Sequence, residues 1–302
     1  MGKIYNISIL LSFVGLWLTS MLSGDLEILL GFILIFSFGI LHGSNDILLI
    51  DSISNKKKPN KYPFIKVLIT YLIIVFSAVI IFYLIPLFAV VLFVLFSAFH
   101  FGEQHWEHKR LEVSNELINC FYFIYGLLVL QLLFILNTTE VIDIVKSITG
   151  YTLTDQLILY SSISNLIVFV LLSIFMYYKS LKFRSVILLE LFHLLIFSII
   201  FKVSTLIWGF TIYFIFWHSI PSLYEQITYI YKDFNNVNIF SYLKKAFPYW
   251  IISLIGIAIV YYIFKEEKLF YAIFFSFLAA ITFPHALVMN KMFTNKKTQS
   301  IK

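Results

Sequence analysis

The 302-residue sequence is poor in charge and in the residues that cross-link or break a chain. Only 13% of its residues are charged, and it has one cysteine, six prolines and eleven glycines. The low charge excludes an ordinary water-soluble domain, in which about 25% of residues are charged. The scarcity of proline and glycine excludes collagen-like and linker-like chains. The single cysteine, Cys120, excludes an internal disulfide framework and a cluster of thiolate metal ligands.

Apolar surface dominates what the sequence does contain. Hydrophobic residues make up 61% of the chain, including 34 Phe and 19 Tyr, which excludes disorder and indicates a membrane protein. A hydrocarbon core about 30 Å thick is crossed by about 20 apolar residues in a helix. Runs of this length predict an all-α fold, a polytopic bundle of about ten transmembrane helices. We expect these helices over residues 4–22, 26–50, 64–85, 86–106, 116–136, 156–178, 183–201, 205–226, 245–264 and 269–290.

The distribution of basic residues predicts the topology. With the N-terminus inside, 18 of the 22 Lys and Arg fall in cytoplasmic segments. One helix more or fewer in mid-chain would move every later segment to the opposite side of the membrane and remove this asymmetry. We therefore expect ten helices with both termini cytoplasmic, forming one transmembrane domain over residues 1–302 in the cell (inner) membrane. The same bias explains the run Lys56-Lys57-Lys58 without nucleic-acid binding. The first span lacks a clean cleavage site, which predicts a retained helix.

Four of the seven histidines have matching positions in their expected helices. Each lies about 13–16 residues into an even-numbered helix, and these helices run in the same direction, so all four are expected about 20–24 Å from the outer end. These residues are His42, His100, His218 and His285. Ionisable groups at membrane depth are costly, and imidazole is a good ligand for Fe, Zn, Cu and Ni. The pattern predicts a buried His-rich metal site; the alternative is that each histidine only hydrogen-bonds a neighbouring helix.

Acidic residues follow two of these histidines at helical spacing. Asp46 is four residues after His42 and Glu103 three after His100, so each can share a helix face with its histidine. A metal-bound imidazole commonly donates its other N–H to a carboxylate, which fixes the ring orientation. Glu225, seven residues after His218, lies on the same face two turns away. Asp46 and Glu225 are equally consistent with a place at the membrane interface.

The remaining histidines have weaker patterns. His105 and His108 end the fourth expected span, where an interfacial role or packing beside Trp106 is favoured. His193 lies in mid-membrane with Glu190 one turn earlier. This last pair is consistent with a contact to a metal ligand, a proton relay or an interhelical hydrogen bond.

The sequences around the four level histidines resemble a known family. They are His42-Gly43-Ser44-Asn45-Asp46, Ser97-Ala98-Phe99-His100-Phe101-Gly102-Glu103, Trp217-His218-Ser219 and Pro284-His285-Ala286-Leu287-Val288. In this order they are similar to the motifs HGxxDH, SxxHFG followed by an acid, WHS and PHxxV of the Brp/Blh family of membrane β-carotene 15,15'-dioxygenases. The resemblance implies an Fe(II)-dependent enzyme that cleaves the central double bond of β-carotene with O2. It would give two molecules of retinal, often to supply an opsin.

The sequence departs from the family at two histidines, and Glu103 matches only loosely the acid that the family has shortly after HFG. Ile47 stands where HGxxDH has its second His, and Ser222 stands where the family has a further iron ligand. His285 or His193 then completes the coordination, or three histidines act with waters, or the reaction is lost. We expect His285, because it has the right depth and helix direction.

The resulting hypothesis assigns a role to each candidate residue. His42, His100, His218 and His285 hold Fe(2+), with no protein nucleophile or general base. The outer residues that orient or support the ligands are Asp46, Glu103, Ser222, His193 and Glu190. Aromatic residues beside the histidines would line a groove for the polyene, unless they are ordinary packing; they are Phe99, Phe101, Phe216, Trp217 and Phe283.

Three other functions compete with this hypothesis. A di-iron desaturase or hydroxylase would need closely spaced HxxxH and HxxHH boxes, which His100, His105 and His108 match only sparsely. A membrane transporter or metal permease would use the histidines transiently, and discontinuous helices or paired intramembrane acids would favour it. A lycopene-cyclase-like enzyme would depend on acidic residues instead.

Overall fold

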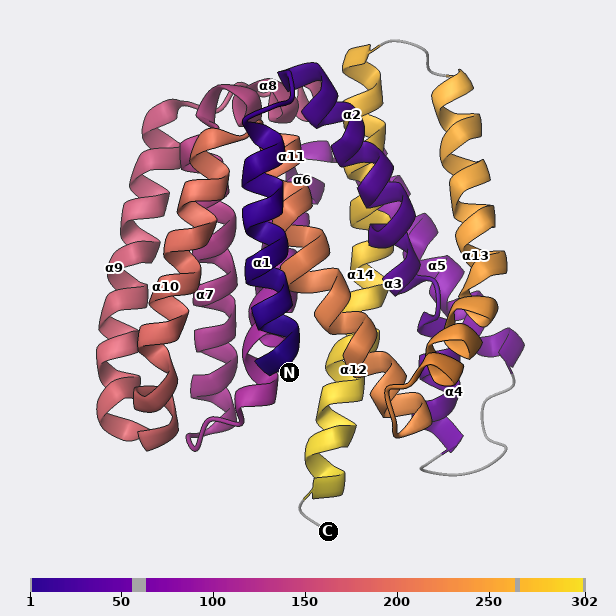
Figure 1. Cartoon of the computed structure of the whole chain (residues 1–302). Helices are drawn as coiled ribbons and strands as arrows, with labels where there is room; N and C mark the ends of the chain where they lie inside the picture. The colour runs from indigo at the N-terminus through magenta and orange to yellow at the C-terminus, as the bar shows by residue number, and fades with distance from the viewer. Residues whose placement is uncertain (1, 56–63, 264–266, 301–302) are drawn as a thin grey trace. The chain divides into compact units, whose positions relative to one another are not determined.

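The chain is helical throughout the part that the structure describes. The computed structural model describes residues 2–55, 64–263 and 267–300, which contain helices and turns but no strand (Figure 1). The all-α prediction is confirmed, and the run Lys56-Lys57-Lys58 lies outside the described residues. The helical segments are α1 (Gly2–Thr19), α2 (Gly24–Leu34), η1 (Ile35–Gly39), α3 (Ile40–Gly43), α4 (Asp46–Asn55), α5 (Phe64–Leu84), α6 (Pro86–Trp106), η2 (Glu107–Lys109), α7 (Asn115–Leu136), α8 (Thr138–Thr149), α9 (Asp155–Lys179), α10 (Leu181–Val203), α11 (Leu206–Ile212), η3 (Tyr213–Ser219), α12 (Ile220–Tyr231), α13 (Asn236–Ile263) and α14 (Glu267–Ser300).

Seven helical runs in the described ranges are long and apolar enough to cross a membrane. They are Gly2–Thr19, Gly24–Ile53, Pro86–Lys109, Asn115–Leu136, Asp155–Lys179, Leu181–Val203 and Leu206–Tyr231. A shorter apolar helix covers Ile69–Leu84. Several apolar spans of this kind indicate a membrane protein, as the composition predicts. The count of ten and the cytoplasmic termini stay predictions.

Two compact units make up the chain. Unit 1 comprises residues 1–35, 97–146 and 150–221, and unit 2 comprises residues 36–96, 147–149 and 222–302. In unit 1, α7, α9 and α10 pack side by side, α1 runs along η3, and α11 runs along α2 (Figure 1). In unit 2, α14 packs against α4 and α5, and α3 packs against α13. The expectation of one domain over residues 1–302 stays a prediction.

Local sequence signals set where several helices begin. Pro86 opens α6 directly after α5 ends at Leu84, which confirms the predicted break between these two spans. Hydroxyl side chains at N-cap positions accept a hydrogen bond from the backbone N–H three residues later, which satisfies a donor that the helix itself leaves unpaired. These caps are Ser114 for α7, Thr154 for α9, Ser180 for α10 and Thr205 for α11.

Helix α8 lies between two of the expected spans, residues 116–136 and 156–178. It is short and polar, so it lacks the long apolar run of a membrane span, and it ends at Gly150 with a left-handed φ of 72°. The Glu140 carboxylate accepts a hydrogen bond from the Leu206 N–H at the start of α11, where negative charge is favourable. Burial raises the pKa of Glu140, this hydrogen bond opposes the rise, and the Glu27 carboxylate adds to it.

Helices α6 and α7 meet at two glycines in unit 1. A Cβ at Gly102 would overlap the backbone carbonyl of Tyr122, and a Cβ at Gly126 would overlap that of Ala98. Only a residue without a side chain allows the two backbones to approach this closely. The glycine that follows His100 and Phe101 therefore has a packing function, which fixes α6 against α7 beside His100.

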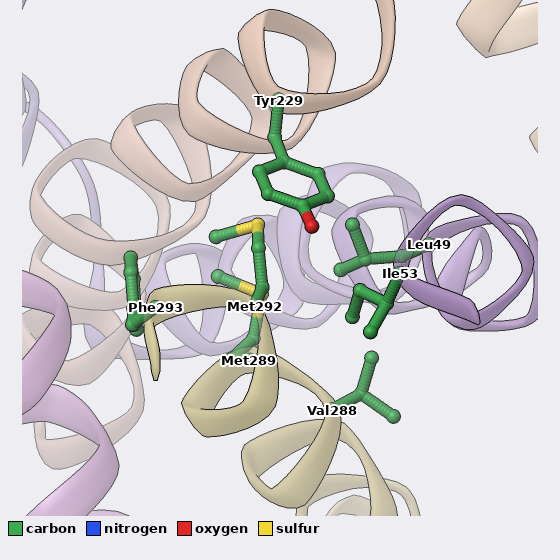
Figure 2. Close-up of a cluster of buried hydrophobic side chains, with 7 residues drawn as sticks. All are labelled: Leu49, Ile53, Tyr229, Val288, Met289, Met292 and Phe293. Atoms are coloured by element: carbon green, nitrogen blue, oxygen red, sulfur yellow. The ribbon is translucent and has the colours of Figure 1, made fainter. Parts of the chain in front are cut away.

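A buried hydrophobic cluster joins three helices of unit 2. Figure 2 shows α4 contributing two aliphatic side chains, α12 one tyrosine and α14 the remaining four residues. Its members are Leu49, Ile53, Tyr229, Val288, Met289, Met292 and Phe293. The two methionines are flexible enough to fill irregular gaps between the helices. The cluster begins one turn after Asp46 in α4 and one turn after His285 in α14. Its packing therefore fixes α4 against α14 close to these two side chains.

The glycine contact predicts a strong effect of one added methyl group. Gly126→Ala should lower the thermal unfolding midpoint of the purified protein, because the two helices must separate, at an overpacking cost of about 1–3 kcal/mol. Gly256→Ala in α13 is the matched control, since no atom lies within 4 Å of its added Cβ. We expect it to leave the midpoint unchanged or raise it. Equal midpoints for Gly126→Ala and wild type would contradict the close approach.

Candidate metal centre

His42 and His285 form a buried pair in unit 2. His42 lies in α3 and His285 in α14, and their ring centroids are 4.7 Å apart with the planes nearly perpendicular. Both side chains are buried. Two imidazoles from distant parts of the sequence thus meet edge to face inside an apolar unit. The expectation that His285 completes the iron ligands together with His42 stays a prediction.

Asp46 fixes the orientation of His285. Its Oδ1 atom lies 2.8 Å from His285 Nδ1, and its Oδ2 accepts a hydrogen bond of 3.1 Å from the Tyr71 hydroxyl. Because a carboxylate only accepts, Nδ1 carries the proton, and the lone pair of the ring lies on Nε2. The prediction placed Asp46 on the face of His42, whereas this hydrogen bond goes to His285. Asp46 starts α4, whereas His42 belongs to α3, and a turn separates the two helices.

A polar network supports the backbone of His42. Gln226 Nε2 donates to the His42 carbonyl (3.0 Å) and to Ser222 Oγ (3.1 Å). The Tyr242 hydroxyl donates to Gln226 Oε1 at 2.6 Å, and Asn45 Nδ2 donates to the Tyr242 carbonyl at 2.9 Å. Ser222, which stands where the family has a histidine, is therefore part of the support for His42. Sequence reasoning missed Gln226 and Tyr242; the available signal was the position of Gln226 one helical turn after Ser222.

His100 and His218 form a second buried pair, in unit 1. Their ring centroids are 4.7 Å apart with an interplanar angle of 79°. The Phe101 ring lies 4.7 Å from His218 on one side, and the Phe214 ring stacks on His218 at 5.4 Å. Glu103, one turn after His100, is also buried. Each unit thus contains one of the two histidine pairs made from the four level positions.

Two π-helical segments are associated with these histidines. His218 lies within η3, and η1 ends three residues before His42. π-Helical turns in α-helices occur frequently at functional sites, because the wider turn changes the direction of side chains and loosens carbonyls. Side chains use these carbonyls in both units: Ser8 Oγ donates to Phe216 O, and Trp250 Nε1 donates to Phe36 O and Ser37 O. Sequence periodicity does not reveal such segments.

The predicted aromatic contacts have different surroundings. Phe101 packs against His218, Tyr213 and Phe214. Phe283 packs against Phe96 in unit 2, and Phe99 and Phe216 are partly exposed. Trp217 is fully buried, and its indole N–H donates to Ser12 of α1 at 2.8 Å. These surroundings leave Phe99, Phe216 and Phe283 the most available to a bound apolar molecule.

Glu190 and His193 belong to another buried cluster of unit 1. Glu190 Oε2 lies 2.5 Å from His105 Nε2 and 3.2 Å from His193 Nδ1, and Glu190 Oε1 forms an ion pair of 2.6 Å with Lys109. His105 is 1% exposed, which favours packing inside the unit over a position at the membrane interface. Sequence reasoning connected Glu190 with His193 but not with His105 or Lys109, which lie on α6 and η2.

Glu225 lies in unit 2, on α12. Its Oε1 atom is 4.0 Å from Lys296 Nζ, a partly exposed lysine of α14. This long ion pair is consistent with the interface position that the sequence analysis left open for Glu225.

The two histidine pairs have the donor chemistry of a transition-metal site. Neutral imidazole nitrogen suits Fe, Zn, Cu and Ni, and a ligating His that donates its other N–H to a carboxylate is the usual arrangement. His285 with Asp46 has this arrangement. The burial of all four rings would exclude water, and the residues present therefore fit a bound iron.

Comparison with known proteins identifies a family. The family model described as Beta-carotene 15,15'-dioxygenase matches residues 33–293, which is most of the chain and includes all four level histidines. No curated protein and no solved structure matches the chain.

Removal of the Asp46 charge tests its link to His285. Asp46→Asn keeps the side-chain size but weakens the acceptor of the Nδ1 proton, so affinity for Fe(II) or Co(II) should fall about 10–100-fold. Competition with a chelator on the purified full chain measures this affinity. Asp51→Asn, which changes an exposed carboxylate of the same helix, should leave it unchanged. Wild-type affinity in Asp46→Asn would disprove the assignment.

Proposed function

Because the chain belongs to the beta-carotene 15,15'-dioxygenase family, we propose that it cleaves the central double bond of β-carotene, or of a related carotenoid, with O2 and releases retinal. It would do so as a non-haem Fe(II) enzyme of the cell (inner) membrane, a multi-pass protein of about ten helices with both termini cytoplasmic. Retinal-binding opsins would be its functional partners.

The observation that carries this proposal is the pairing of the motif histidines. His42 meets His285, and His100 meets His218, each at 4.7 Å between ring centroids in a buried setting. We infer that these four residues hold one Fe(2+), as their equal depth in parallel spans predicts. Bound iron would supply the open coordination positions and the electrons that O2 chemistry needs. No protein nucleophile or general base is required.

The surrounding residues would keep the ligands in place. Asp46 holds the His285 ring by its Nδ1–H, and Gln226 with Ser222 holds the His42 backbone. Glu103 is proposed to orient an imidazole of unit 1, beside His100. Each of these groups is buried, so the energy of a misplaced ring would be high, and we propose that the ligand set would be organised before a metal binds.

The substrate would come from the bilayer. A polyene as apolar as β-carotene has negligible aqueous solubility, and a chain with 34 Phe can bind it by contact and ring packing. We propose Phe99, Phe101, Phe216 and Phe283 as lining residues. The buried Trp217, bonded to Ser12, would contribute by holding η3 against α1.

Expression in a cell that accumulates β-carotene tests the reaction. Loss of yellow colour together with the appearance of retinal is the expected result, measured by chromatography of extracted pigments. Persistent colour with an intact, membrane-inserted and iron-loaded protein would contradict this substrate. Uptake or release of metal across the membrane without pigment cleavage would favour a metal permease instead.

The ligand assignment has its own test. Replacing His42, His100, His218 or His285 singly by Ala should abolish iron retention and retinal formation while membrane insertion is unchanged. His108→Ala is the matched control, because His108 is a histidine of the same chain outside both pairs. If three of the four variants keep full iron and activity, the assignment is wrong.

A further inference from the structure

The cluster around Glu190 contains none of the four proposed iron ligands, although the sequence analysis placed Glu190 and His193 among the outer residues of that centre. Its members come from three segments of unit 1: His105 from α6, Lys109 from η2, and Glu190 with His193 from α10. All four side chains are at most 9% exposed. A carboxylate buried to this extent requires partners, and here it has three.

The partners divide between the two oxygens of Glu190. Lys109 Nζ binds Oε1, and this single ammonium already balances the carboxylate charge. Both imidazoles instead converge on Oε2, through His105 Nε2 and His193 Nδ1. Neutralisation therefore accounts for Lys109 but not for two histidines that aim nitrogens at one oxygen.

The converging atoms have the spacing of a ligand set. One nitrogen of each histidine and one oxygen of Glu190 lie within 4.8 Å of one another. Donors around one ion at metal–ligand distances of about 2.0–2.2 Å are separated by about 3.0–3.5 Å. The Glu190 Oε2 atom would need to move less than about 1 Å away from His105 Nε2 for the distance between these two atoms to reach that range. Two imidazoles and one carboxylate are ligands that Zn²⁺ and Fe²⁺ both accept.

We propose that His105, Glu190 and His193 form a second metal site, for a divalent first-row transition cation such as Zn²⁺, and that Lys109 limits its affinity. Lys109 orients the ligating carboxylate through Oε1, as outer partners of metal ligands do. Its positive charge also repels the incoming cation. The same lysine lies 4.0 Å from the centre of the Trp106 ring, which offers the ammonium a second favourable contact.

The surroundings of the cluster suit a structural site. Aromatic rings enclose it: Tyr125 stacks on His105 at 5.0 Å, and Trp217 lies 4.8 Å from His193. The Tyr5 ring of α1 lies 5.4 Å from His105. His105 is the penultimate residue of α6, whereas Glu190 and His193 lie in the middle of α10. A metal here would connect α6 to α10 within unit 1.

Counting bound zinc in four forms of the full chain separates the two sites. The purified protein is stripped, reloaded with Zn²⁺ and analysed by mass spectrometry of the metal. We expect about two ions per chain in wild type, about one in His193→Ala, about one in His285→Ala and about none in the double variant. A wild-type count in His193→Ala would overturn the second site, whereas a wild-type count in His285→Ala would contradict the iron-centre assignment alone.

Lys109→Met supplies a test that loss of folding cannot imitate. Removal of the competing charge should tighten Zn²⁺ binding at this site about tenfold or more, and Zn²⁺ should raise the unfolding temperature of this variant more than that of wild type. Adding Glu190→Gln to Lys109→Met should abolish the gain. His108→Ala is the matched control and should keep the wild-type zinc count. If Lys109→Met binds zinc no more tightly than wild type, the proposed role of Lys109 in limiting the affinity is wrong.

Discussion

The structure depends on one constraint: a chain this apolar must pair its few buried polar groups with one another. Water inside an apolar bundle is scarce, and an unpaired buried group costs several kcal/mol. The chain meets the constraint with specific partners. Asp46 accepts from His285 and Tyr71, Ser12 accepts from Trp217, and Glu190 pairs with Lys109. Each pairing also fixes the direction of a side chain, so the same bonds that make burial tolerable organise the candidate sites.

Irregular helices contribute to that organisation. Both π-helical segments are adjacent to or contain a motif histidine, and both offer backbone carbonyls to side chains of other helices, to Trp250 in unit 2 and to Ser8 in unit 1. At the α6–α7 contact, Gly102 and Gly126 allow the backbones to meet beside His100. The motif residues thus divide into proposed ligands and residues whose function is packing, and Gly102 belongs to the second group.

Much of the helical fold follows from the sequence, because apolar length and a few caps determine where helices run; Pro86 at the start of α6 is an example. Helix α8 could not be predicted in this way, since a short amphipathic helix lacks a long apolar run. The four histidines could be selected because they lie at similar distances along their expected helices. The family match over residues 33–293 agrees with the resemblance seen in the motifs around them. The sequence alone could not show that Asp46 contacts His285, which is 239 residues away, or that Gln226 contacts His42. Such contacts between distant segments depend on how the helices pack, and the local spacing of residues carries no information about that packing.

The central claim is that the two histidine pairs serve one ion. X-ray absorption at the iron edge tests it most directly, on iron-loaded protein carrying His193→Ala so that only the proposed centre can hold iron. The account predicts a first shell of nitrogen or oxygen at about 2.0–2.2 Å without sulfur, and multiple scattering from about four imidazole rings per iron. Scattering from only about two rings would show that the pairs do not share a metal, and would contradict the account.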